Sequence, residues 1–164
     1  MHGLNEQLLE EVRRRTSIVE EYFRNYYEYL SRRKFAKASE ALWGILNNLA
    51  SILSVLYGGE PISKHVELRE LVTLLAKKLG NQEILRWYRA CEKLHANYFH
   101  NFMDEDEFEE HRIEAEKLID ELQKTGVRGV EEARHRTLKK PRLPYEDSRI
   151  PRGSAYDSEL RSLQ

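Results

Sequence analysis

The sequence lacks most features of a secreted, membrane-spanning or zinc-binding protein. Its 164 residues include one cysteine, Cys91, which excludes an internal disulfide and a cysteine-based zinc site and is typical of a reducing cytoplasm. No apolar run reaches the roughly 18 residues of a membrane span. No secretory leader precedes the first apolar segment. We therefore predict a cytoplasmic protein that makes no contact with a membrane, and we expect neither a metal nor a cofactor.

Signals for strands and for phosphate-binding loops are also missing. No alternating β-branched run is bounded by hairpin turns, and there is no glycine-rich phosphate loop or nucleophile elbow. Apolar residues instead recur at steps of three and four, the spacing of buried helical faces. Because the connections are short, we predict an all-α, up-and-down bundle of four to five main helices.

The charge divides the chain into two parts. The net charge is −1 overall, but residues 1–126 carry −4 and residues 127–164 carry +3. A part with −4 is no general nucleic-acid binder, so a polyanion would have to contact a local patch or the basic tail. After Gly126 the sequence is polar and loses its periodicity. We predict a helical domain over 1–126 and a basic, largely disordered, flexible tail over 127–164.

Capping signals divide the first part into helices. Ser17–Glu20 and Asp104–Glu107 resemble capping boxes, and Ser63 is a candidate N-cap. Gly58, with Gly59 and Pro61 after it, and later Gly126 are candidate helix ends. The resulting prediction is a first segment at 4–12, then helices at 17–30, 35–57, 63–79, 82–103 and 104–124, with a short one at 130–138.

The helix predicted over 82–103 places a histidine among apolar residues. Its stripe at helical spacing is Ile84, Tyr88, Cys91, His95, Tyr98 and Phe102. Imidazole exchanges protons near neutral pH, so His95 can act as a general base on a ribose 2′-hydroxyl while Arg89 stabilises charge on the phosphate. Six residues place these two about 120° apart on a helix, so their cooperation needs either the long arginine to wrap around the helix or a second chain to complete the site. The alternative is a hydrogen-bonded core histidine and a solvated arginine.

A second pattern is a basic and polar stripe on another face of the same helix. Its members are Arg86, Arg89, Lys93, Asn97 and His100, and such a stripe can bind phosphates of RNA or of a nucleotide. We also expect Asn97 and Tyr98 to line the catalytic site. The alternative is a solvated helix face. A metal site from His100, Asp104, Glu107 and His111 is less favoured, because the acidic residues already suit a helix start.

Three phrases together resemble a known superfamily. They are Lys37-Ala-Ser-Glu-Ala-Leu-Trp-Gly44, His65-Val-Glu-Leu-Arg-Glu-Leu71 and Leu94-His-Ala-Asn-Tyr-Phe99. The sequence is similar to the HEPN superfamily (higher eukaryotes and prokaryotes nucleotide-binding), and to its archaeal paralogous-repeat branch, expanded in thermophilic crenarchaea. The resemblance covers about residues 18–124.

The resemblance implies a helical bundle that forms a homodimer around the helix carrying arginine and histidine. It implies a metal-independent endoribonuclease of a toxin–antitoxin or defence system, or else a non-catalytic module such as the accessory subunit of a small nucleotidyltransferase. The expected partners are an antitoxin, a nucleotidyltransferase or RNA. Arg89 and His95 match the superfamily motif, whereas Ala90 stands where a polar residue usually follows the arginine.

Overall fold

The computed structural model describes the backbone of residues 2–138 and the side chains of residues 6–130. Within that range the chain forms five helices and no strand, which confirms the predicted all-α bundle. The helices are α1 (His2–Ser31), α2 (Phe35–Leu56), α3 (His65–Leu79), α4 (Glu83–His100) and α5 (Glu105–Leu138). The predicted flexible tail lies, beyond residue 138, outside the described residues.

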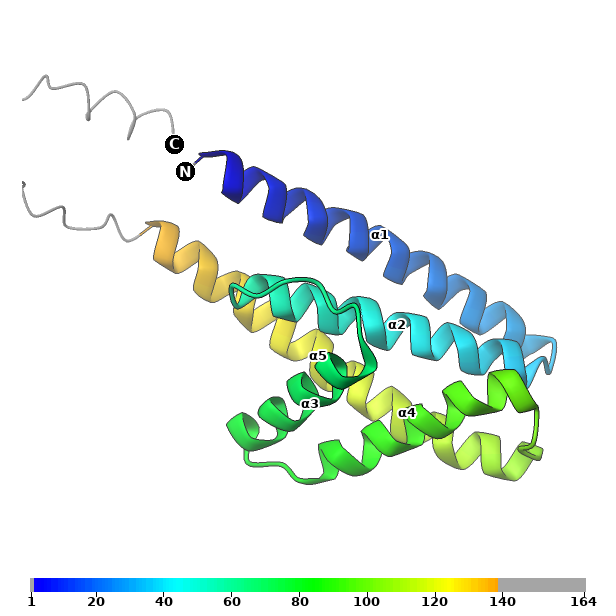
Figure 1. Ribbon diagram of the computed structural model, residues 1–164. Coiled ribbons are helices and arrows are strands. Elements are labelled where there is room, and N and C mark those ends of the chain that lie inside the picture. The colour runs from blue at the N-terminus through cyan, green and yellow to red at the C-terminus, as the bar shows by residue number, and fades with distance from the viewer. Residues whose placement is uncertain (1, 139–164) are drawn as a thin grey trace, which may run out of the picture. The chain divides into compact units, whose positions relative to one another are not determined.

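Helix α2 is the centre of the bundle. It packs against α1 on one side and against α3 and α4 on the other (Figure 1). Phe35 of α2 also contacts Phe108 of α5, with ring centroids 4.7 Å apart. By length and composition α2 could cross a membrane, but 61% of its most apolar window is buried inside the bundle. The core helix of a folded bundle has the same properties, so this composition is explained by packing.

Most of the predicted helix ends are close to the observed ones. Gly58 has a φ of 87° and donates to the carbonyl of Val55, closing α2 as predicted. Helix α3 begins at His65 after Lys64, one residue later than predicted, and the Glu67 carboxylate accepts from the backbone N–H of Ser63 and Lys64. The Asp104 carboxylate accepts from the Glu107 N–H, which caps α5.

Two predicted breaks are wrong. The chain does not stop and restart at Ser17: α1 is continuous, and the Thr16 hydroxyl donates to the Val12 carbonyl four residues back within the helix. Gly126 does not end a helix either, since α5 continues through it to Leu138 and includes the separate helix predicted at 130–138. The division into a domain and a tail at residue 126 stays a prediction.

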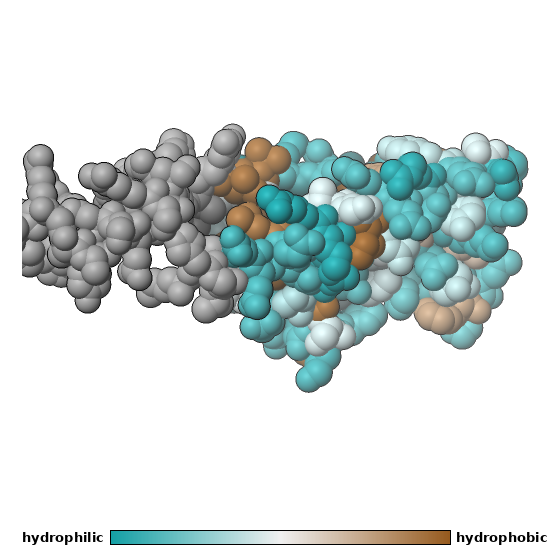
Figure 2. Space-filling view, turned by 90° about the horizontal axis from the view of Figure 1, so that it is seen from above, coloured by the Kyte–Doolittle hydropathy of each residue, from teal (hydrophilic) through white to brown (hydrophobic). Residues whose placement is uncertain are grey.

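The core is a single apolar cluster contributed by all five helices. The largest fully buried side chains include Tyr26, Leu42, Ile45, Leu68, Ile84, Leu94, Phe108, Leu118 and Leu122. Apolar surface is visible in Figure 2 towards the start of α1 and the end of α5. The exposed apolar side chains of α1 and α5 include Leu8, Leu9, Val127 and Val130. The core holds α2, α3 and α4 in fixed positions, and these three helices build the candidate site.

Candidate functional site

Three helices bring an indole and two imidazoles into contact. Trp43 of α2 stacks on His95 of α4, with ring centroids 4.3 Å apart and planes 15° apart. Trp43 also stacks on His65, the first residue of α3, at 4.7 Å and 26°. The ring of Phe99 meets His95 edge-on at 5.2 Å. We call Trp43, His65, His95 and Phe99 the histidine–tryptophan cluster.

The two imidazoles lie side by side on one face of the indole. Their centroids are 5.6 Å apart. If they lay on opposite faces of Trp43, their separation would approach the sum of the two stacking distances, which is much larger. The rings of His65 and His95 are therefore neighbours on the same side of Trp43.

His95 is held in its neutral form by its surroundings. Burial lowers the pKa of His95, and the neighbouring His65 lowers it further by charge repulsion. The Nδ1 atom of His95 is buried without a hydrogen-bond partner among the described residues. A protonated imidazole would place an N–H there with no acceptor, so this geometry also favours the neutral ring. Neutral imidazole is the form that accepts a proton.

The rim of the cluster is aromatic and open to solvent. Phe99 is 65% exposed, and His65 is exposed at the start of its helix. Tyr98 is half-buried, with its ring 4.9 Å from that of Phe99. Exposed aromatic rings beside proton-exchanging groups can stack on the bases of a single-stranded nucleic acid.

Arg89 and His95 do not converge within one chain. Arg89 lies on the exposed side of α4, whereas Tyr88 and Cys91 on either side of it are buried. Among the described residues Arg89 forms no hydrogen bond or ion pair. The divergence agrees with the roughly 120° expected for a spacing of six residues. Arg89 and His95 therefore lie on different faces of α4.

The predicted stripes on α4 need two corrections. Asn97 is fully buried, not on an exposed stripe: its carboxamide donates to the Ser39 hydroxyl at 3.4 Å and accepts from the Met103 N–H at 2.9 Å. Phe102 is not part of a buried stripe, because Asn101 takes a φ of 45° and ends the helix before it. Phe102 is 54% exposed. Leu94 and Asn97 take the inward positions instead.

The basic residues of α4 are spread over different environments. Arg86 forms ion pairs with Glu83 of its own helix and with Glu114 of α5. Lys93 and His100 are exposed. Since Arg86 is already paired and Asn97 is buried, the stripe is not a continuous phosphate-binding surface. The nucleotide-binding roles of Arg86, Lys93, Tyr98 and His100 stay predictions.

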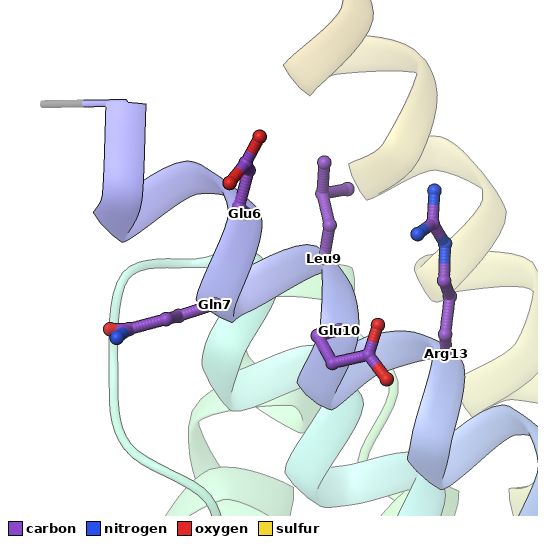
Figure 3. Close-up of a pocket in the computed structure, with 5 residues that line it drawn as sticks. All are labelled: Glu6, Gln7, Leu9, Glu10 and Arg13. Carbon is purple, nitrogen blue, oxygen red and sulfur yellow. The ribbon is translucent and has the colours of Figure 1, made fainter.

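Neither the pockets nor the acidic residues form a competing site. Figure 3 shows one pocket, an open groove lined by side chains of the first turns of α1, in which Leu9 and Arg13 point in a different direction from Gln7. No group of three histidine, cysteine or carboxylate side chains gathers for a metal within the described part of the chain. The metal site considered from the sequence therefore does not form. Its four residues would have been His100, Asp104, Glu107 and His111.

Sequence reasoning found His95 but missed its neighbours. His65 has no partner nearby in sequence, since it lies 30 residues before His95. One signal was available: the three phrases that carried the resemblance contribute all the rings of the cluster, Trp43 from the first, His65 from the second, and His95 and Phe99 from the third. The three segments therefore lie next to one another in the folded chain.

The comparison with protein families covers this site. The model of the Archaeal PaREP1/PaREP8 family matches residues 14–119, well over half of the chain. The chain belongs to this family. Among curated proteins and among solved structures nothing matches. The matched range of the PaREP1/PaREP8 member contains Arg89 and the whole histidine–tryptophan cluster.

Proposed function

We propose that this PaREP1/PaREP8 protein is a HEPN-type, metal-independent endoribonuclease that acts on single-stranded RNA. The observation that carries the proposal is the neutral His95, stacked on Trp43 beside the exposed ring of Phe99. The His95 imidazole is partly buried yet adjoins an exposed aromatic rim. A general base that acts on a flexible polynucleotide needs this arrangement, because the rim can stack on the nucleobases. We further propose that the protein acts in the cytoplasm, in the toxin–antitoxin or defence setting that its resemblance to the HEPN superfamily implies.

In the proposed reaction His95 accepts the proton of a ribose 2′-hydroxyl. The 2′-oxygen attacks the adjacent phosphorus, and the products are a 2′,3′-cyclic phosphate and a 5′-hydroxyl. Charge grows on the non-bridging phosphate oxygens, and a guanidinium is suited to stabilise it. Because Arg89 and His95 lie on different faces of α4, we assign this role to Arg89 of the other subunit of a homodimer.

A second candidate function is a non-catalytic interaction module. It is favoured by the unpartnered Nδ1 of His95, since no carboxylate or carbonyl fixes the tautomer that a base needs. In this function the cluster is a rigid aromatic surface, and a nucleotidyltransferase or an antitoxin partner supplies the chemistry. This candidate predicts no RNA cleavage by the purified protein.

Cleavage of labelled total RNA and tRNA in EDTA separates the two functions. The wild type is compared with His95→Ala, Arg89→Ala and a control, His111→Ala, on α5. We expect His95→Ala and Arg89→Ala to cleave RNA about 10²–10⁴-fold more slowly than the wild type. The control should cleave at the wild-type rate, and the products should carry 2′,3′-cyclic phosphate ends. Equal cleavage by all four proteins, or none, would remove the nuclease proposal and leave the module.

Mixing the two inactive variants tests the composite site. In a heterodimer of His95→Ala and Arg89→Ala, one site retains both groups if they come from different chains, and the other site retains neither. Random exchange then restores about a quarter of the wild-type rate, because half of the dimers are mixed and each has one working site of two. No recovery after exchange would show that both groups act from the same chain.

A further inference from the structure

The cluster contains a second imidazole that the proposed reaction has not used. Cleavage of a phosphodiester needs a proton acceptor at the 2′-oxygen and a proton donor at the departing 5′-oxygen, because an alkoxide is a poor leaving group. The superfamily motif supplies one histidine. The structure places another, His65, with its ring centroid 5.6 Å from that of His95.

We infer that His65 is the general acid that protonates the leaving 5′-oxygen, with Trp43 as the platform that aligns both imidazoles. The inference rests on the proposed nuclease function and adds a catalytic residue to it. Its basis is geometric: two imidazoles from different helices lie on one indole face, with their ring centroids 5.6 Å apart.

The environments of the two rings assign the roles. His95 is half-buried, with an unpartnered Nδ1, and its surroundings disfavour the charged ring. His65, by contrast, is exposed at the start of α3. A pair of titratable groups in contrasting environments is the arrangement that separates a base from an acid. His95 is therefore the acceptor and His65 the donor.

The position of His65 on α3 also favours a phosphate. His65 is the first residue of a 15-residue helix, where the helix dipole attracts an anion. The Glu67 carboxylate opposes this attraction, but it is already bound by the backbone N–H groups of Ser63 and Lys64 and by the Ser63 hydroxyl. Lys64 adds a positive charge beside His65.

The step balances as follows in atoms and charge. The 2′-O–H bond breaks and its proton passes to His95, while the 2′-oxygen forms a bond to phosphorus. The bond from phosphorus to the 5′-oxygen breaks, and this oxygen takes the proton of His65. His95 ends protonated and His65 neutral, and exchange with water restores both. No oxidant, reductant or metal takes part.

A substrate that needs no acid tests the assignment. RNA with a bridging sulfur in place of the 5′-oxygen releases a thiolate, which departs without a proton. We expect His65→Gln to slow cleavage of the oxygen substrate by about 10²–10⁴ and to cleave the sulfur substrate at nearly the wild-type rate. His95→Gln is expected to lose activity on both. Circular dichroism checks that each variant is helical.

The outcomes separate the inference from the function on which it rests. Wild-type rates for His65→Gln on the oxygen substrate, or equal losses on both substrates, would overturn the role of His65 while the nuclease function stands. If the wild type cuts neither substrate, the nuclease function fails and the inference fails with it. Because His65 is exposed at the first turn of α3, its replacement leaves the core intact.

Discussion

Two clusters of side chains in this bundle differ in whether their polar groups have hydrogen-bond partners. Where α1 meets α5, the buried Tyr26 donates to the Glu116 carboxylate at 2.5 Å, and Arg112 donates both to Glu116 and to the Tyr26 hydroxyl. Every polar group of that cluster has a partner. In the histidine–tryptophan cluster the aromatic rings contact one another, and Nδ1 of His95 has no hydrogen-bond partner among the described residues.

The difference separates groups that hold the fold from groups available for chemistry. Burial and the bond to Glu116 raise the pKa of Tyr26, so its proton stays in place. The α1 side of the bundle is also tightly packed, since a Cβ at Gly44 of α2 would lie 2.5 Å from the Tyr22 ring of α1. On the α3–α4 side, the buried Nδ1 of His95 has no hydrogen-bond partner among the described residues. A region whose hydrogen bonds are incomplete is where a ligand is expected.

The close approach of α1 and α2 gives the largest expected effect on stability. Gly44→Ala forces a methyl group into the Tyr22 ring and should lower the free energy of unfolding by about 1–3 kcal/mol. The matched control is Gly126→Ala in α5, where nothing lies within 4 Å of the added Cβ. That variant should gain about 0.5–1 kcal/mol, because alanine is the better helix former. Urea denaturation measures both.

The same pair of variants tests whether the contact between α1 and α2 is tightly packed. If Gly44→Ala is as stabilising as Gly126→Ala, the Tyr22 ring moves aside without loss and the α1–α2 contact is not tight. A double variant, Gly44→Ala with Tyr22→Leu, should recover part of the loss, since the shorter side chain makes room for the methyl group.

Tyr26→Phe tests whether the paired cluster is purely structural. Removing the hydroxyl takes away one partner of Glu116 and should lower the free energy of unfolding by about 1–2 kcal/mol. RNA cleavage should stay at the wild-type rate at a temperature where the variant is folded. Tyr27→Phe, at a side chain that is 61% exposed, is the control and should change neither quantity. A loss of cleavage in Tyr26→Phe with the fold retained would contradict the separation of the two clusters.

Local signals in the sequence predicted helices well where the ends are chemically marked. The end of α2 follows from Gly58, and the start of α5 follows from Asp104. The same signals misled at Ser17 and Gly126, because a hydroxyl or a glycine also fits inside a helix. A glycine there costs only about 1 kcal/mol relative to alanine. Thr125 beside Gly126 bonds the Glu121 carbonyl within the helix and is buried, so packing carries α5 onward.

The candidate site was only partly predictable, because half of it depends on tertiary packing. His95 was found from its place in an apolar stripe, although Leu94 and Asn97, not Phe102, share the inward face. The contact between His65 and His95 depends on how α3 and α4 pack on Trp43, which no local pattern contains. The burial of Asn97 likewise follows from the chain turning at Asn101 and returning its Met103 N–H to the carboxamide.

The smallest expected effect is a pH dependence of stability caused by His95. Because its pKa is lowered in the folded state, the unfolded chain binds the proton first as the pH falls below about 6.5. The stabilisation is complete above that value and is lost as the pH falls through the folded pKa.

In urea titrations between pH 7 and pH 5, His95→Gln should show a shallower fall in the free energy of unfolding than the wild type. His65→Gln should keep most of the slope, because burial is the larger cause of the shift and repulsion by His65 the smaller. Parallel curves for the wild type and His95→Gln would show that the ring is solvated in the folded state, and the contrast with Tyr26 would then disappear.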